Sequence, residues 1–575
     1  MLTLLHCANQ AKAPFSKSTS KRNRGVLSLL AVVVGLAACT SPPSSSTSLT
    51  TIASGTGPPT PAPIGELPAA AAAIMAKPEF KTARWIYSVV DPQTGEVLLA
   101  NHPDELVFTA STAKNFTVGA VYATAGPDAT LTTPVYATAP AVDGLVDGDL
   151  VLVASGDLAL GGRGAMEGRV DHTFTATTID HVYGDVAPNA ALVPDDPLAG
   201  LDDLARQVKE AGITSVAGDV MIDTRIWNTF AGQEGPVPSV FVNDNILDIT
   251  VNAGAVGEPA TLDLRPETSA IAVTSTVTTS DATTPTALRV TPSPSDPSAI
   301  TVSGTIAAGA SQLTIYRVPD AATWARTLFV EALRRAGISV TAPAVGPNNE
   351  ASLPPQNSFP AEQKVAAITS PPLEAFGTMI LKTSYNTGAN AMMCLMAARA
   401  GSPDCIDGLK TVHEQIDKAG LVADHVLLFD GQGADPASTT PTQMAAWMRW
   451  AQTQPWGAAL VAGQPVLGVD GTLASTGQNS PAKGKVAAKT GTSVALDPTT
   501  NRLYYKVQSL AGYLTTDQGR NLVFALSMSG ATYPDLATGL HDANEDVAGV
   551  AAALQQAFSA APLPAAITDV MNKPR

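Results

Sequence analysis

The sequence predicts a mixed α/β (α+β) protein in which a mostly-β region interrupts a domain built of helices and a sheet. Three short motifs stand in order along the 575-residue chain, at positions 111–114, 384–386 and 489–491. The first two motifs are 273 positions apart, whereas the last two are separated by 105 positions, an ordinary span for one domain;. The long interval consists of short Val-, Ile-, Thr- and Leu-rich runs parted by Pro, Gly and Asp. Such runs are typical of β-strands, so the interval predicts an insertion.

The boundaries of the insertion follow from these spacings and from composition. Residues 66–162 and 361–575 are predicted to form one discontinuous domain that carries all three motifs, and residues 163–360 the inserted mostly-β region, as two subdomains. Two helices, 201–211 and 320–336, interrupt the inserted strands, and each runs into Ala-Gly-Ile and a further strand. This near-repeat suggests two related units. The expected inserted strands include 246–251, 270–277, 299–302 and 312–318.

The discontinuous domain is expected to combine helices with strands. Its first piece opens with an alanine-rich helix and a hairpin around Asp-Pro-Gln-Thr-Gly, followed by a helix that stops at Gly126-Pro127;. Its second piece holds helices around Ser384, another helix, three strands and a closing helix, and the last strands and helix should pack beside the strand of Lys489. The expected ranges are 69–76, 85–90, 96–100 and 111–123, then 442–453, 485–493, 509–514, 522–528 and 543–559.

The first motif, Ser-Thr-Ala-Lys, places a serine and a lysine on one face of a helix. Residues three apart on a helix are neighbours, so the Lys114 amine can reach the Ser111 hydroxyl and act as its base. The positive end of the helix dipole favours the negative charge that develops on the serine. Lys114 must be neutral to accept a proton, and we expect burial and the nearby cation Lys489 to lower its pKa. The same Ser-x-x-Lys pattern at 18–21 and 480–483 has no such helix around it.

The second motif, Ser-Tyr-Asn, supplies a hydroxyl and an amide that face the same way from a short turn. The Ser384 hydroxyl can relay a proton to a leaving group, and the Asn386 amide can hold a substrate carbonyl. Both are candidate catalytic residues, together with Ser111, Lys114 and Lys489.

The third motif, Lys-Thr-Gly-Thr, is predicted to lie on an edge strand. The Lys489 amine and the hydroxyls of Thr490 and Thr492 would hold an anionic carboxylate. Gly491 leaves room for a substrate backbone to approach as an added strand. The oxyanion of the reaction should be held by backbone amides, those of Ser111 and Thr492. The order, uniqueness and context of the three motifs indicate acyl transfer through a serine ester.

Together with four other segments, these motifs resemble the class C penicillin-binding proteins, the D-alanyl-D-alanine carboxypeptidase/endopeptidases that carry inserted domains. The segments are the strand and Gly-Asp at 150–157, the strand at 217–223, Asn-Asp-Asn at 243–245, and Asp-Gly-Gln-Gly at 430–433 with the Thr-Pro that follows. The resemblance covers most of the chain from about Pro68 onward. It implies the serine β-lactamase/DD-peptidase-like transpeptidase fold, with extra mostly-β domains inserted between the first two motifs.

The resemblance also implies an activity. The chain is expected to be a serine-type D-Ala-D-Ala carboxypeptidase that trims peptidoglycan stem peptides through a Ser111 acyl-enzyme, with no cofactor. DD-endopeptidase action on cross-bridges would use the same machinery, and β-lactams should acylate Ser111. The alternatives are a β-lactamase or an esterase of the same fold, or a catalytically idle cell-wall-binding lipoprotein.

Three departures from the family pattern affect these expectations. Tyr385 stands where relatives usually carry Asp or Asn, and its side chain is expected to face away from the nucleophile, with altered packing. Gln432 replaces the usual Ser of the Asp-Gly loop, which affects fine substrate contacts. The segment after Asp157 lacks the usual Pro-Thr, so no role is transferred to it.

The front of the chain predicts export. A basic stretch at 21–24 precedes an apolar run that ends Leu-Ala-Ala-Cys at Cys39, so residues 1–39 are expected to be a signal peptide with a lipobox;. Lipidation of Cys39 would anchor the protein to a bacterial membrane, in the periplasm or at the cell surface. Residues 40–65 form a Ser/Thr/Pro-rich linker;. The alternative is a plain signal peptide that happens to carry a cysteine.

Composition excludes several other classes of function. The net charge is −16 and only 15% of residues are charged, so no basic patch indicates nucleic-acid binding;. The chain has no Cys-x-x-Cys and no His-Glu-x-x-His, and no metal site is expected;. The absence of Gly-x-Ser-x-Gly argues against an α/β-hydrolase triad;. Cys394 and Cys405 either pair as a disulfide in an oxidising compartment or remain two buried thiols.

Overall fold

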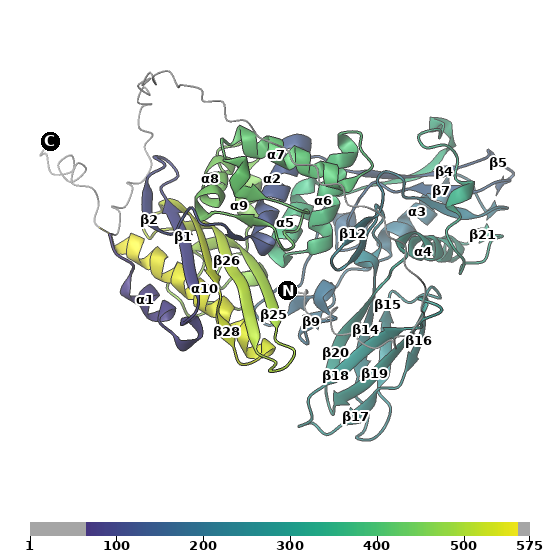
Figure 1. The fold of residues 1–575 in the computed structure, drawn as a ribbon. Coiled ribbons are helices and arrows are strands. Elements are labelled where there is room, and N and C mark those ends of the chain that lie inside the picture. The colour runs from purple at the N-terminus through teal and green to yellow at the C-terminus, as the bar shows by residue number, and fades with distance from the viewer. Residues whose placement is uncertain (1–64, 562–575) are drawn as a thin grey trace, which may run out of the picture.

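The computed structural model describes residues 65–561, so the expected signal peptide, Cys39 and nearly all of the linker lie outside the described residues. Figure 1 shows two halves side by side: a sheet with helices on both faces, and an inserted half of smaller sheets. The main sheet has the strand order β2-β1-β27-β26-β25, with β28 (Thr532–Tyr533) paired to β26. Its strands are β1 (Arg84–Val90), β2 (Val97–Asn101), β25 (Val486–Leu496), β26 (Leu503–Thr515) and β27 (Asn521–Ser529).

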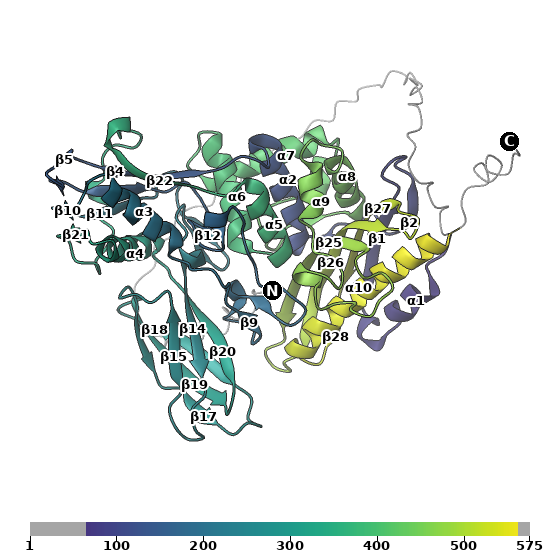
Figure 2. The ribbon, with the colours of Figure 1, turned by 180° about the vertical axis from the view of Figure 1, so that it is seen from behind.

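Two helices from opposite ends of the chain cover one face of this sheet. They are α1 (Ala69–Met75) and α10 (Leu536–Ala560), which lie side by side in Figures 1 and 2. Helix α10 begins at Leu536, seven residues before the start at 543 that the sequence predicts. Asp535 caps it by accepting the backbone N–H of Thr538;. The core under this face is formed by alternate side chains of the sheet, such as Phe524 and Leu526, packed against side chains along one side of α10, such as Val547 and Leu554.

A bundle of helices covers the other face and carries the first two motifs (Figure 2). Its core centres on Phe116 and Trp447, whose rings lie 5.0 Å apart. The helices are α2 (Lys114–Ala125), α5 (Leu373–Thr383), α6 (Asn386–Arg399), α7 (Gly408–Lys418), α8 (Pro441–Ala451) and α9 (Gly457–Ala462). Within residues 65–561 no helix combines the length and apolar character that crossing a bilayer requires.

The inserted half begins with two four-stranded sheets. One has the order β11-β7-β4-β22 and the other β21-β10-β6-β5. The near-repeat seen in the sequence gives α3 (Ala199–Glu210) followed by β10 and α4 (Ala321–Arg335) followed by β21, and β10 pairs with β21 in parallel. The two related segments thus lie side by side in one layer. The strands are β4 (Thr132–Ala137), β5 (Ala141–Val142), β6 (Leu145–Val146), β7 (Leu150–Val153), β10 (Ser215–Val216), β11 (Val220–Asp223), β21 (Ser339–Val340) and β22 (Lys364–Thr369).

A second β-module projects from these sheets, at the bottom of Figure 1. Its first sheet has the order β15-β14-β20, and in its second sheet β16, β17 and β18 all pair with β19. The strands are β14 (Ile246–Asn252), β15 (Thr261–Arg265), β16 (Ala272–Ser275), β17 (Thr278–Ser280), β18 (Ala287–Pro292), β19 (Ala299–Ala307) and β20 (Ser311–Arg317). Short strands near the junction with the helices are β8 (Ile179–Asp180), β9 (Ala190–Ala191), β12 (Phe230–Gly232) and β13 (Gly235–Val237).

The sheet β11-β7-β4-β22 bears on the domain boundaries. Strands β4, β7 and β22 fall in the segments assigned from sequence to the motif-bearing domain, yet β7 pairs with β11 of the insertion, and β4 and β22 continue the same sheet. Their buried side chains, such as Val135 and Leu152, belong to the same core as those of α3 and α4. We therefore propose that the insertion is better bounded near residues 131 and 370 than at 163 and 360.

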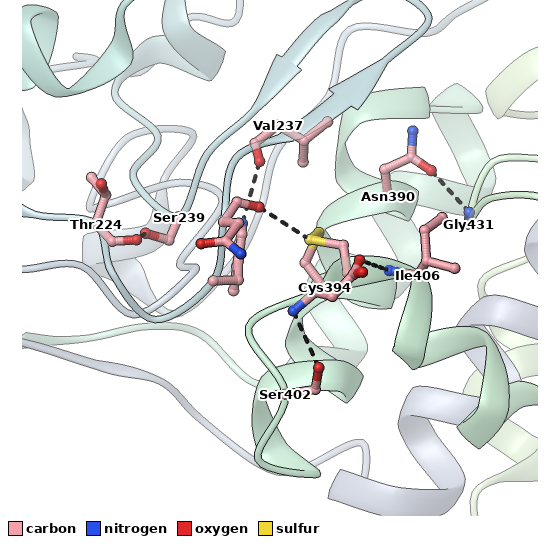
Figure 3. The surroundings of a disulfide bond; sticks show 12 residues. Thr224, Val237, Ser239, Asn390, Cys394, Ser402, Ile406 and Gly431 are labelled. Atoms are coloured by element: carbon pink, nitrogen blue, oxygen red, sulfur yellow. Dashed lines mark hydrogen bonds between the residues drawn. A yellow bond between two sulfur atoms is a disulfide. The ribbon is translucent and has the colours of Figure 1, made fainter.

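Cys394 of α6 forms a disulfide with Cys405 of the short 3-10 helix η9 (Cys405–Asp407). Figure 3 shows the disulfide on the helix that also carries Asn390, beside the inserted chain near Val237. The backbone N–H of Asn228 donates to the Pro403 carbonyl at 2.8 Å, inside the loop that the disulfide closes. The disulfide loop therefore contacts the insertion directly.

Candidate active site

The sequence predicts a helix that starts at Ser111, whereas in the structure the first motif begins one turn before helix α2. Ser111 lies in the 3-10 turn η3 (Ala110–Ala113), and α2 starts at Lys114. The spacing of three residues still brings the side chains together, with Ser111 Oγ and Lys114 Nζ 2.6 Å apart. Ala110, directly before the serine, has a φ of 42°, which L-residues rarely adopt;. The nucleophile thus sits at a sharp change of chain direction.

Lys114 is fully buried and its amine faces oxygen atoms. Besides Ser111 Oγ, Lys114 Nζ donates to Asn386 Oδ1 at 2.6 Å and to the Gln432 carbonyl at 3.1 Å. Burial lowers the pKa of Lys114 to about 7, against the attraction of the Glu234 and Asp430 carboxylates. The amine is therefore neutral in an appreciable fraction of molecules at neutral pH and can accept the Ser111 proton.

The second motif occupies the junction between two helices. Helix α5 ends at Thr383, Ser384 adopts a left-handed conformation with a φ of 62°, and α6 begins at Asn386. The Asn386 side chain bridges two groups, because Oδ1 accepts from Lys114 and Nδ2 donates to the Glu234 carboxylate. Both ends of this amide are thus engaged within the site.

The third motif lies on β25, at the edge of the main sheet, as the sequence predicts. The Lys489 side chain is fully buried, and its Nζ donates to the Thr490 carbonyl at 2.9 Å. Burial and the charge of Lys114 hold the pKa of Lys489 well below its usual range. The two lysines therefore interact, as expected, although the effect appears on Lys489 and burial is what lowers the pKa of Lys114.

The threonine hydroxyls beside Lys489 also have partners. Thr490 Oγ1 donates to Thr472 Oγ1 at 2.8 Å, and Thr492 Oγ1 donates to Gln508 Oε1 at 2.7 Å. A hydroxyl can accept as well as donate and can rotate toward a new acceptor. Both hydroxyls can therefore exchange these bonds for bonds to a bound carboxylate.

Two glycines allow flanking segments to approach the backbone before Ser111. A Cβ at Gly491 would lie 2.5 Å from the Thr109 carbonyl oxygen, and one at Gly433 would lie 2.1 Å from the Ala110 carbonyl oxygen. Only glycine fits such distances. The edge strand and the Asp-Gly-Gln-Gly loop therefore hold the nucleophile segment from two sides.

The carboxylate of Asp430 shapes that loop. Its Oδ1 accepts the backbone N–H groups of Gln432, Gly433 and Ala434 at 3.1, 2.7 and 3.1 Å, respectively. The loop conformation in turn aims the Gln432 carbonyl at Lys114. Burial raises the pKa of Asp430.

Comparison with known proteins agrees with this geometry. The model of the D-Ala-D-Ala carboxypeptidase 3 (S13) family matches residues 67–552 of the chain. The chain belongs to this family. It is therefore a serine-type D-Ala-D-Ala carboxypeptidase, a hydrolase of the penicillin-binding protein class.

Individual relatives show the extent of the likeness. The chain is 27% identical over 497 residues to the D-alanyl-D-alanine carboxypeptidase of Actinomadura sp. (strain R39), covering 80% of each chain. It is similar to the crystal structure of penicillin-binding protein 4 from Haemophilus influenzae, with a TM-score of 0.63, 19% identity and coverage of 84% of this chain and 99% of that one. The complex of that protein with a β-lactam gives a TM-score of 0.61, at 20% identity and the same coverage. The expected serine β-lactamase/DD-peptidase-like fold is thus confirmed.

In this carboxypeptidase the residues that depart from the family pattern make contacts of their own. The Gln432 side chain accepts from Asn390 Nδ2 at 3.1 Å and donates to Gln233 Oε1 at 3.0 Å. The Tyr385 ring is buried, and burial together with the Asp244 carboxylate raises the pKa of its hydroxyl well above the usual range. Tyr385 therefore lies toward the insertion.

Sequence reasoning missed three site residues supplied by the insertion. Glu234 and Gln233 form the tip of the β12–β13 hairpin, where they contact Asn386 and Gln432. Tyr183 donates to the backbone of the second motif. The Gly-Gln-Glu-Gly stretch at 232–235 signals a tight turn, but nothing local indicates what the turn contacts;.

Other groupings do not extend the site. Among residues 65–561 no cluster of three or more His, Cys, Asp or Glu side chains is arranged to hold a metal ion.

Proposed function

We propose that this carboxypeptidase removes the terminal D-Ala of peptidoglycan stem peptides through an ester on Ser111. Neutral Lys114 takes the Ser111 proton as Ser111 Oγ attacks the carbonyl carbon of the penultimate D-Ala. The backbone amides of Ser111 and Thr492 hold the oxyanion of the tetrahedral intermediate. The peptide C–N bond then breaks, the amine of the leaving D-Ala takes a proton relayed through Ser384, and water hydrolyses the ester.

One observation carries the proposal: the short contact between Ser111 Oγ and a buried lysine whose pKa is about 7. A lysine with an ordinary pKa is protonated at neutral pH and cannot act as a base. The remaining positions support the same chemistry. Asn386 would bind the substrate carbonyl after exchanging Glu234 for it, and Lys489, Thr490 and Thr492 would hold the terminal carboxylate, with Gly491 giving the substrate backbone room.

The same machinery would act on related bonds. Cleavage of D-Ala cross-bridges between stem peptides places the same carbonyl at Ser111, so we include DD-endopeptidase activity in the proposal. A β-lactam presents a strained amide and a carboxylate in similar positions, and it should acylate Ser111. The relative from Haemophilus influenzae was solved in complex with a β-lactam.

A fluorescent penicillin tests the proposal. The label should bind the wild type stably and be absent from Ser111→Ala, while D-Ala release from a D-Ala-D-Ala peptide is lost in parallel. Rapid loss of the label by hydrolysis would favour the β-lactamase alternative, and a preference for simple esters would favour an esterase. Failure of the wild type to react at all would leave only a cell-wall-binding role.

The place of action follows from the substrate. A D-Ala-D-Ala carboxypeptidase acts on peptidoglycan, so it works outside the cytoplasm. We further propose that Cys39 is lipidated and that residues 40–65 tether the enzyme to a bacterial membrane. Cys39→Ala should move the protein from the membrane fraction to the soluble fraction without changing the penicillin reactivity of the purified enzyme.

A further inference from the structure

Tyr183, a residue of the insertion, contacts the turn that carries the second motif. Its hydroxyl oxygen lies 3.0 Å from the Thr383 carbonyl oxygen and 2.9 Å from the Ser384 carbonyl oxygen. The single hydroxyl proton is thus shared between two consecutive carbonyls. Tyr183 ends the 3-10 helix η5 (His181–Tyr183), and only 6% of its surface is exposed.

The turn needs such a partner because its backbone is strained. The last carbonyls of a helix have no intrahelical donor, and Thr383 is the last residue of α5;. Ser384 adopts a φ of 62°, a left-handed conformation that is unfavourable for an L-residue;. The Tyr183 hydroxyl binds the carbonyls on both sides of the Ser384 Cα. It therefore fixes the residue whose Oγ must meet the leaving group.

Tyr183 is itself held by a buried charge cluster on one side. The Arg163 guanidinium donates to Asp180 Oδ1 at 2.9 Å and to Asp244 Oδ2 at 2.8 Å. His181 joins the same cluster, with Nδ1 2.8 Å from Asp248 Oδ1 and Nε2 3.0 Å from Asp244 Oδ2. All five side chains are buried. Breaking such pairs is costly because it leaves charges without partners.

Arg317 of β20 holds the other side of the segment. It donates to the Val182 carbonyl and, at 3.0 Å, to Asp185 Oδ2. The residue directly before Tyr183 and the one two positions after it are thus both bound to the Arg317 guanidinium. The ring of Phe174 packs edge-on against the Tyr183 ring, with the centroids 6.4 Å apart. These contacts fix the Tyr183 ring relative to the insertion, so its hydroxyl keeps its position if the Ser384 turn shifts.

We propose that Tyr183 is a positioning residue for the reaction: it holds the Ser384 turn so that the serine hydroxyl is aligned to relay the proton to the leaving amine. This role rests on the relay function proposed above for Ser384. The insertion thereby acts on catalysis through a contact that does not touch the substrate.

Tyr183→Phe tests the proposal, because it removes the hydroxyl and keeps the ring packing. The purified enzyme is assayed on a peptide ending in D-Ala-D-Ala and on a thiolester with the same acyl group. We expect kcat/KM for the peptide to fall about tenfold, the size of one well-placed hydrogen bond. The value for the thiolester should stay within about twofold, because a thiolate leaves without prior protonation.

Two further variants separate the possible failures. Tyr513→Phe is the matched control, since it also removes a buried hydroxyl that donates to a backbone carbonyl, that of Met448 at 3.2 Å. It should leave both substrates unaffected. Ser384→Ala should lose the peptide reaction more than the thiolester reaction.

Each remaining outcome decides against the inference. Equal losses on both substrates in Tyr183→Phe would indicate general structural damage and overturn the positioning role. An active Tyr183→Phe beside a defective Ser384→Ala would overturn it while leaving the relay in place. A fully active Ser384→Ala would remove the relay function and the inference together.

Discussion

At the scale of single residues, the site depends on Lys114, whose pKa is held near 7 by opposing effects. Burial lowers the pKa of Lys114, and the carboxylates of Glu234 and Asp430 partly restore it. The resulting pKa of about 7 is close to the value at which a base is both available and effective;. Glu234 thus contributes to the reaction from the insertion through its charge.

A pH profile of acylation should show this balance. Neutral Lys114 is the reactive form, so the rate of penicillin acylation should rise with pH through a midpoint near 7. Glu234→Gln removes a negative charge that favours protonated Lys114, so the Lys114 pKa falls and the midpoint moves to lower pH. At pH 6 the variant should react about threefold faster than the wild type, equivalent to about half a pH unit. The profile is measured by stopped-flow with a fluorescent penicillin.

The exposed Glu362 provides the control, because Glu362→Gln makes the same change on the surface of the insertion. Its profile should coincide with that of the wild type. A shift of the Glu234→Gln midpoint to higher pH would contradict the assigned effect of the carboxylate on Lys114.

The sequence predicted the residues whose chemistry depends on local spacing. Ser111 and Lys114 are three apart, and that spacing brought the atoms together even though a 3-10 turn replaced the first helical turn. Glu234 and Tyr183 escaped prediction because their contacts lie 152 and 201 positions away along the chain. Such contacts are set by how the insertion packs, and no local pattern records them.

At the scale of elements, the nucleophile segment is held between β25 and the Asp430 loop. Gly491→Ala would place a methyl group 2.5 Å from the Thr109 carbonyl oxygen and 3.1 Å from the Thr112 nitrogen. The strand must then move away from Ser111, and a displacement of about 1 Å can cost on the order of 100-fold in rate. We expect penicillin acylation to fall by about that factor, measured as the second-order rate constant.

A control for this substitution is Gly346→Ala, where the nearest atom to the added methyl is an Arg326 nitrogen at an ordinary 3.5 Å. That variant should acylate normally. Normal acylation of Gly491→Ala as well would mean that β25 is not fixed against the nucleophile segment.

A disulfide cross-links Cys394 of α6 to Cys405 of η9. It closes a loop with a sequence separation of 11, and replacing both cysteines with alanine should lower the free energy of unfolding by about 2–3 kcal/mol;. Urea unfolding measures the loss. A reducing agent should destabilise the wild type by a similar amount and leave the double variant unchanged; equal stability of both proteins under oxidising conditions would contradict the prediction.

Element boundaries show where sequence patterns were insufficient. Helix α10 was predicted to start at 543, and Thr538 and Gly539, which precede that position, are poor helix formers;. The helix starts at Leu536, since Asp535 caps it and the sheet covers its first turns;. Tertiary packing thus extended a helix that local preference had shortened.

At the scale of the whole molecule, the insertion divides into a part that reaches the active site and a part that does not. The hairpin with Glu234 and the segment with Tyr183 belong to the first part. The β-module built on β14 and β20 points away from the motifs in Figures 1 and 2. Strands β14 and β20 of this module pair directly with each other, and the last pair of opposite residues is Asn252 and Ser311.

This division predicts that the outer module is dispensable for chemistry. Replacing residues 253–310 with Asn-Gly would join β14 to β20 by a two-residue turn, which suits directly paired antiparallel strands;. The shortened enzyme should react with fluorescent penicillin within about threefold of the wild-type rate, with a lower melting temperature because part of its core is removed;. A folded but unreactive variant would show that the module supports the site.

The overall architecture was predicted well because the motif spacing itself records the insertion. The boundaries that we propose differ from those expected from sequence, because β4, β7 and β22 have strand patterns that fit either domain. Only the pairing of β7 with β11 shows which sheet they join. Strand pairing across long sequence distances is the information that a single sequence carries least directly.

The strand order of the main sheet also governs when the sheet can be completed as the chain is made. Strand β1 is made early, but it pairs with β27, so that Val90 lies opposite Val523 near the other end of the chain. Until β27 emerges, one edge of the β1–β2 hairpin has no partner, and an unpaired apolar edge invites aggregation. The nucleophile is likewise synthesised long before Lys489 and the glycine that confine it. The site is therefore complete only after the last strands of the main sheet have been made, and until then the unpaired edge of the hairpin is exposed to aggregation.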